Sequence, residues 1–154
     1  MEENWPYNLP IFRRSFKLTS PDGKISAEIR DAVEVSMSNP TIGLLVFSNG
    51  MTIEKCNPSF IWSDDSRYLA VPQYNSNWFF GIGKQRLLVV DILENILYES
   101  RKLAYYIQPE KFTRGTLTVT IEPARKAKSV TYEVVDIIKT FSKLELPGPS
   151  LRTA

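Results

Sequence analysis

The residue types that most often carry catalysis are scarce in this sequence. Its 154 residues include no histidine and a single cysteine, Cys56. The lack of histidine excludes Ser-His-Asp and Cys-His arrangements and removes the commonest general base. Zinc sites built from cysteine and histidine clusters are excluded for the same reason. We therefore predict no catalytic residue, no metal site and no cofactor, and we expect Cys56 to pack as a small hydrophobic residue.

Paired carboxylates are the remaining route to hydrolysis, because two Asp or Glu side chains can divide the acid and nucleophile roles. Asp64 and Asp65 are adjacent, but they lie in a turn-like segment, where aspartate bonds the local backbone and faces water. Asp91 and Asp136 each follow an apolar run, and we interpret both as residues that end or tie a strand. A carboxylate-based hydrolase is therefore only a remote alternative.

The most distinctive stretch runs from Gln73 to Gln85, which we expect to be a long loop between two strands. It gathers aromatic and amide side chains, namely Tyr74, Asn75, Asn77, Trp78, Phe79 and Phe80. Exposed aromatic residues on loops provide a large contact area at little entropic cost, so they often anchor interfaces. The alternative is that Trp78, Phe79 and Phe80 fold back to plug an open end of the protein or continue a strand. The sequence leaves both interpretations open.

Turn signals recur along the chain and indicate how these residues are positioned. Ser20-Pro-Asp-Gly-Lys24 is typical of a tight turn, with proline and glycine setting the backbone angles and aspartate bonding locally. Ser63-Asp-Asp-Ser-Arg67 begins 43 residues later, and Gln108-Pro-Glu-Lys111 begins a further 45 residues on. The spacing predicts three equivalent turns.

Apolar segments repeat with the same offsets. Leu44-Leu-Val-Phe-Ser48 matches Leu87-Leu-Val-Val-Asp91 at 43 residues, and Val89-Val-Asp-Ile92 is identical to Val134-Val-Asp-Ile137 at 45 residues. Because the turns and the apolar segments are independent landmarks that repeat with the same two offsets, we interpret the sequence as an internal repeat.

Each unit reads as four apolar runs of strand length bounded by turn residues. We predict an all-β single domain of three four-stranded antiparallel meanders, over residues 14–56, 57–101 and 102–145, with 1–13 and 146–154 as caps or tails. The expected strands are 14–19, 24–30, 42–48 and 51–56 in the first unit, 58–63, 67–73, 86–93 and 96–101 in the second, and 102–108, 115–121, 130–138 and 141–145 in the third.

The apolar pattern also predicts which strands are covered. Strands with neighbouring units on both faces should be continuously apolar, and Leu44–Phe47 and Leu87–Val90 fit this expectation. Thr116–Glu122 alternates between apolar residues and threonine, so we expect one of its faces to meet solvent. Trp62 ends an apolar run and is expected in the core. The weak helical periodicity between Val135 and Leu144 is better explained by the repeat.

One stretch carries a resemblance to a known class of proteins. Pro58–Val71 followed by Leu87–Asp91 resembles blades of TolB-type and WD-repeat β-propellers, in the order strand, Ser-Pro-Asp-Gly-like turn, strand, loop, strand ending in aspartate. Ser20–Lys24 supplies a turn of the same kind, and the resemblance covers about residues 14 to 145. It implies blade-like repeats, although no Gly-His or Trp-Asp dipeptide marks the units.

Three blades are fewer than the four to eight of closed propellers. We therefore expect a partial propeller or a sandwich-like stack, whose open strand edges and uncovered faces invite association with another chain. A homodimer that closes a six-bladed ring is slightly favoured over a capped monomer.

Composition narrows the choice of partners. The net charge of +2 gives no electrostatic footprint for nucleic acid, and no apolar run approaches the length that a membrane span needs. The acidic first residues lack the features of a secretory signal, so we expect a cytoplasmic protein. We predict a non-enzymatic protein that binds another protein through its inter-strand loops and open blade edges. The alternative is a small-ligand or carbohydrate-binding module that uses residues 73–85.

Overall fold

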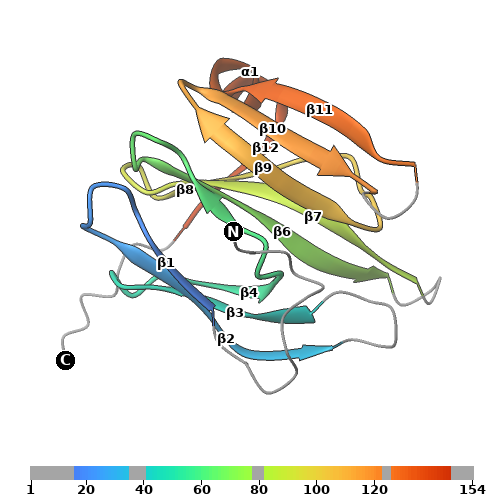
Figure 1. The fold of residues 1–154 in the computed structure, drawn as a ribbon, viewed down its shortest axis with the longest axis horizontal. Coiled ribbons are helices and arrows are strands. Elements are labelled where there is room, and N and C mark those ends of the chain that lie inside the picture. The colour runs from blue at the N-terminus through green and yellow to red at the C-terminus, as the bar shows by residue number, and fades with distance from the viewer. Residues whose placement is uncertain (1–15, 35–40, 78–81, 123–125, 147–154) are drawn as a thin grey trace.

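The apolar runs form an all-β protein, as predicted. The structure is a computed structural model, and it describes residues 16–34, 41–77, 82–122 and 126–146 (Figure 1). The strands are β1 (Phe16–Thr19), β2 (Ser26–Glu34), β3 (Thr41–Phe47), β4 (Thr52–Cys56), β5 (Ile61–Trp62), β6 (Tyr68–Asn77), β7 (Ile82–Asp91), β8 (Ile96–Glu99), β9 (Ile107–Thr113), β10 (Thr116–Ile121), β11 (Lys128–Glu133) and β12 (Ser142–Glu145), with one helix, α1 (Val134–Thr140). Within these ranges no helix is apolar and long enough to cross a bilayer.

The first two meanders pair in chain order. β1 to β4 are antiparallel neighbours, and β5 to β8 form a second antiparallel series. The two series join at a single pair, Cys56 with Gln73, so that they belong to one sheet. The joined sheet therefore turns back on itself and supplies two layers.

The third unit differs from the prediction. β9, β10 and β11 form a separate three-stranded sheet, whereas β12 pairs with β8 at the edge of the second series. The prediction of a four-stranded third unit is therefore wrong in its last strand. Between β11 in the small sheet and β12 in the large sheet the chain forms α1, where we expected the continuation of a strand. Ile137 is buried and Val134 and Phe141 pack against the same core, so their spacing of three and four residues suits a helix.

Three layers of strands enclose two apolar cores (Figure 1). The core between the first and middle layers takes Leu69, Val71, Leu88 and Val90 from β6 and β7. The core between the middle and third layers takes Tyr68, Ala70, Leu87 and Val89 from the same strands. Successive strand residues point to opposite faces. The middle layer is therefore covered on both sides, which confirms the prediction for Leu87–Val90.

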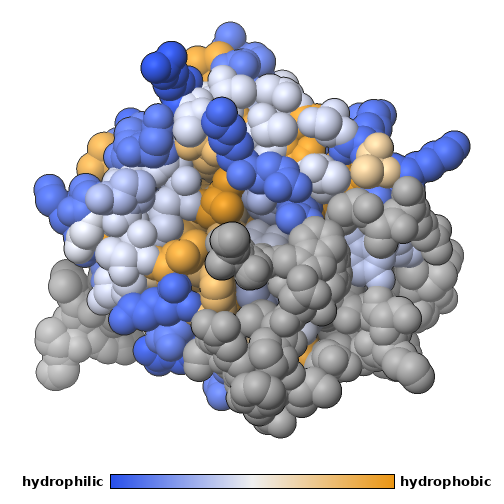
Figure 2. Space-filling model, viewed as in Figure 1, coloured by the Kyte–Doolittle hydropathy of each residue, from blue (hydrophilic) through white to orange (hydrophobic). Residues whose placement is uncertain are grey.

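The outer layers are covered on one face only. In β3, Leu45 and Phe47 are buried, while Leu44 and Val46 are half-buried, so the expectation of two covered faces for Leu44–Phe47 is wrong. The reason is position, because this unit ends the stack. In β10, Leu117 and Val119 are buried and the threonines are partly exposed, which confirms the predicted alternation. On the side of the molecule seen in Figure 2, the coloured apolar residues form small patches between hydrophilic ones.

The turns at Ser20 and Ser63 have the same hydrogen bonds. Ser20 Oγ donates to Asp22 Oδ1 at 2.7 Å, and Ser63 Oγ donates to Asp65 Oδ1 at 2.6 Å. Each hydroxyl also accepts a bond from the amide five residues later, and each Oδ1 accepts one from the amide two residues later. These bonds, led by that from the Lys24 amide, hold the pKa of Asp22 below its usual value. The 43-residue offset relates two turns of one geometry.

The third turn lies later than predicted. Gln108–Lys111 falls inside β9, and the chain reverses instead at Arg114 and Gly115, which have φ of 51° and 77°. Residues 100–106 form an added connection between β8 and β9, so the strands of the third unit start later than the offset predicts. The predicted 45-residue offset therefore does not locate the third turn.

Candidate functional site

The stretch expected to be a long loop is mostly strand. Gln73–Asn77 belongs to β6 and Ile82–Gln85 belongs to β7, and the two strands pair over ten residues. The long-loop expectation is therefore wrong, because the pairing of β6 with β7 continues through both ends of this stretch. Trp78, Phe79 and Phe80 lie outside the described residues.

The remaining members of the predicted site do not share one surface. Tyr74 and Asn75 are consecutive in β6, so their side chains point to opposite faces of the middle layer. Tyr74 pairs with Gln85, whereas Asn75 borders an open depression with Arg86, Glu99 and Arg101. Asn77 is the last residue of β6 and pairs with Ile82. The described residues therefore do not gather the predicted aromatic and amide groups into one site.

One end of the stack holds the ends of three strands, one from each layer. β2, β6 and β10 all stop on the right side of Figure 1, and we call this side the hairpin end. The opposite side carries the turns after β1, β5 and β9.

A mostly apolar pocket opens between the middle and third layers at the hairpin end. Its volume is about 140 Å³. The buried part of its lining is Leu87, Ala104, Ile107 and Val119, each no more than 8% exposed. Ile121 and Lys128 also line it, and they face each other where β10 and β11 meet the 123–125 connection. The pocket therefore lies at the edge of the second core.

The connection from β8 to β9 forms one wall of this pocket. Gln85 and Ala104 exchange two backbone hydrogen bonds, at 2.6 Å and 3.0 Å, which fix the connection to β7. The buried Gln85 side chain accepts a bond from the Ile107 amide at 2.8 Å through Oε1. Ser100 Oγ accepts a bond from the Leu87 amide at 3.0 Å. These bonds hold the wall in place without a regular strand.

The third layer holds the same connection from the other side. The Tyr105 amide donates to Glu122 Oε2 at 3.0 Å, and the Glu122 amide donates to the Tyr106 carbonyl at 2.9 Å. Lys84 Nζ lies 5.1 Å from the centre of the Tyr105 ring, a cation–π distance. The pocket is therefore framed by two layers and the segment tied between them.

Two positive side chains line the pocket. Lys102 and Lys128 are exposed and both line the pocket, and Arg101 and Lys126 are exposed close to them in sequence. The nearby carboxylate of Glu99 is engaged by Arg86, with 2.9 Å between the charged atoms. An apolar interior with a positive opening suits an amphipathic, acidic ligand.

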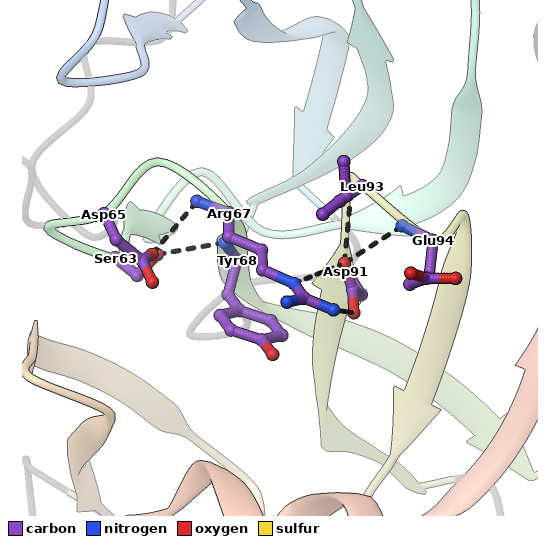
Figure 3. A network of polar contacts seen from close by, with 7 residues as sticks. All are labelled: Ser63, Asp65, Arg67, Tyr68, Asp91, Leu93 and Glu94. Atoms are coloured by element: carbon purple, nitrogen blue, oxygen red, sulfur yellow. Dashed lines mark hydrogen bonds and ion pairs between the residues drawn. The ribbon is translucent and has the colours of Figure 1, made fainter.

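A network of polar contacts around Arg67 and Asp91 joins strand ends on the side opposite the hairpin end (Figure 3). Arg67 donates to both carboxylate oxygens of Asp91, at 3.1 Å and 2.8 Å, and Asp91 Oδ1 also accepts bonds from the amides of Leu93 and Glu94. Asp65 Oδ1 accepts hydrogen bonds from Ser63 Oγ and from the Arg67 amide within its own turn. The network ties strand ends together and leaves neither carboxylate available as a paired catalytic group.

The remaining acidic candidates also have local roles. Asp64 accepts a bond from the Arg114 amide at 3.1 Å and so links the second turn to the third. Asp91 ends β7, as predicted. Asp136 does not end a strand, because it lies in the first turn of α1.

Cys56 and Trp62 pack as predicted. Cys56 is fully buried, and burial raises the pKa of its thiol, so it stays protonated. Trp62 is partly buried against the first core, where its indole Nε1 donates to the Leu18 carbonyl at 3.1 Å. Within the described ranges, no group of three Cys, Asp or Glu side chains is placed to hold a metal ion.

Comparison with known proteins gives no match: no protein-family model, no curated protein and no solved structure is similar to this chain. The resemblance to propeller blades stays a prediction based on the motifs quoted above. Sequence reasoning missed the pocket, because its lining comes from β7, the 100–107 segment, β10 and β11. No short motif marks the pocket, because its charged lining residues, Lys102 and Lys128, are 26 positions apart in sequence.

Proposed function

We propose that this protein is a non-enzymatic binding protein that holds a segment of another protein at its hairpin end. The observation that carries the proposal is the pocket between the middle and third layers, with a volume of about 140 Å³. An engineered apolar cavity of about 150 Å³ is known to admit benzene, so this pocket has the size of one aromatic or branched side chain.

The size of the pocket supports a protein partner over the alternative of a free small ligand. Sites for small molecules and cofactors usually enclose about 300–1,000 Å³. Protein interfaces, in contrast, concentrate their binding free energy in a few side chains that enter well-packed pockets. A single-residue pocket therefore favours a protein partner over a free small ligand. A carbohydrate module is not favoured, because Tyr74 and Asn75 lie on opposite faces of the middle layer.

The polar chemistry of the described residues supports a binding role. Asp65 accepts two hydrogen bonds within its own turn, Asp91 is paired with Arg67, and Cys56 is buried with a raised pKa. None of these groups is poised to attack a substrate or to transfer a proton to one.

Selection from a displayed library of random short peptides tests the proposal. The informative variant is Val130→Phe, because Val130 lines the pocket and a larger ring there would fill it. The matched control is Thr131→Phe, which adds the same ring to the exposed face of β11. Peptides selected on the native protein should bind the Thr131→Phe protein and fail to bind the Val130→Phe protein. Selection that enriches no peptide sensitive to Val130→Phe would overturn the proposal, provided that both variants unfold at native-like temperatures.

A further inference from the structure

We infer that the pocket takes an aromatic or branched aliphatic side chain from a partner segment that carries aspartate or glutamate beside this anchor residue. The inference rests on the proposed function and adds the chemical class of the partner. Two independent features of the opening lead to it, namely its positive side chains and the engagement of the carboxylates around it.

The positive side chains come from two different parts of the fold. Lys102 belongs to the connection after β8, and Lys128 is the first residue of β11. Both line the same pocket although 26 residues separate them in sequence. Arg101 and Lys126 are exposed one and two positions away from these lysines in sequence. Among the described residues, none of these four side chains forms an ion pair.

The carboxylates of this region have other partners. Glu99 forms an ion pair with Arg86, and Glu122 accepts the amide of Tyr105. Among the described residues, neither carboxylate forms an ion pair with the two lysines that line the pocket. Complementary charge at the rim of an interface mainly steers association and excludes partners of the wrong charge. A partner with carboxylates next to its anchor would place them within reach of these flexible ammonium groups.

The apolar lining sets the other half of the partner's chemistry. Leu87, Ala104, Ile107 and Val119 line the inner part of the pocket with hydrocarbon. A charged side chain in this position would lose hydration without gaining a partner, which is costly. The acidic groups must therefore flank the anchor and cannot replace it. An extended segment advances about 3.3 Å per residue, so flanking positions one or two residues away remain near the opening.

The peptides selected on the native protein test this inference directly. We expect the enriched sequences to hold one aromatic or branched aliphatic residue with Asp or Glu within two positions of it. The strongest peptide is then synthesised in two forms, one as selected and one with every Asp and Glu replaced by Asn and Gln. Its affinity is measured by amide chemical-shift titration of the native protein and of the Lys102→Gln/Lys128→Gln double variant.

The expected result is a charge effect that depends on both lysines. Exposed ion pairs contribute modestly, so the double variant should bind the acidic peptide about five-fold more weakly at low salt. The neutral peptide should bind the native protein and the double variant equally. An exposed double variant distant from the pocket, Lys17→Gln/Lys55→Gln, serves as the control for overall charge.

Failure of the inference differs from failure of the proposed function. Enriched peptides that are sensitive to Val130→Phe but have neutral or basic flanks would overturn the acidic partner and keep the binding pocket. An acidic peptide that binds the Lys102→Gln/Lys128→Gln protein with unchanged affinity would also overturn the acidic partner and keep the binding pocket. A selection without any peptide sensitive to Val130→Phe would remove the proposed function itself.

Discussion

Arg67 donates two hydrogen bonds to the carboxylate of Asp91, with its Nη2 at 2.8 Å and its Nε at 3.1 Å from the two oxygens. The carboxylate is 2% exposed, while the guanidinium side chain is 37% exposed. Asp91 also caps the turn after β7 through the amides of Leu93 and Glu94. One ion pair therefore fixes the start of β6, the end of β7 and the turn that leads to β8.

Removal of Arg67 should destabilise the fold strongly. Arg67→Ala leaves the buried Asp91 carboxylate without its counter-charge, and breaking a buried pair in this way costs about 3–5 kcal/mol, so about 2–4 kcal/mol is expected for this half-open pair. Chemical denaturation measures the loss. The matched control is Arg30→Ala, which breaks the exposed pair with Glu28 and should cost less than about 1 kcal/mol. Equal losses in the two variants would contradict a structural role for the Arg67 pair.

The turns at Ser20 and Ser63 should respond equally to mutation. Ser20→Ala and Ser63→Ala each remove one bond to an aspartate and one bond from the amide five residues later. Each loss should lower the free energy of unfolding by about 1–2 kcal/mol, and the double variant should show their sum. Thermal and urea unfolding provide the comparison. A large effect in one variant and none in the other would argue against equivalent turns.

Gly43 should tolerate no side chain. A Cβ at this position would lie 2.6 Å from the Arg30 carbonyl oxygen and 2.8 Å from Ile29 Cγ2. The contact arises because β2 carries an irregularity between Arg30 and Val33 opposite β3. Gly43→Ala should therefore cost about 1–3 kcal/mol through overpacking. Gly23→Asn is the control, because Gly23 has open space around it and asparagine tolerates its φ of 76°. A native-like melting temperature of the Gly43→Ala protein would refute the close approach of β2 to Gly43.

Stability should fall at alkaline pH because of Cys56. Burial raises the pKa of its thiol, so the folded state retains a proton that the unfolded state loses. The contribution is complete below the usual thiol pKa of about 8.5 and decreases by up to about 1.4 kcal/mol per pH unit above it.

Burial raises the pKa of Tyr68, Tyr98 and Tyr132 in the same direction, which adds to the loss above about pH 10. Urea unfolding at a series of pH values measures the slope. Cys56→Ala should flatten the slope between about pH 8.5 and pH 10, where the tyrosines contribute little. An unchanged slope in that variant would exclude the thiol as the cause.

Several features of the fold could be read from the sequence because they are local. The Ser20 and Ser63 turns follow from serine, aspartate and glycine or serine at fixed spacing, since the bonds that define them span two to five residues. The continuous apolar run Leu87–Val90 indicated a strand covered on both faces, and all four side chains are buried.

Other features depended on contacts between distant residues. The identical Val-Val-Asp-Ile segments at Val89 and Val134 form a strand and a helix, because the second packs Ile137 against a core while the first extends β7. β12 was predicted in the third unit, but it pairs with the edge strand β8 of the second series. Short segments do not encode such choices alone, since tertiary packing overrides weak local preference.

The sequence by itself determined the β class, the strand order of the first two units and the absence of histidine chemistry, because these depend on composition and near neighbours. The tertiary structure alone decided where the pocket between the middle and third layers lies. Leu87, Lys102, Val119 and Lys128 come together only when the connection after β8 is tied to β7 and to the end of β10. No local pattern records a cavity, because its shape is set by the distance between layers that pack through side chains far apart in the chain.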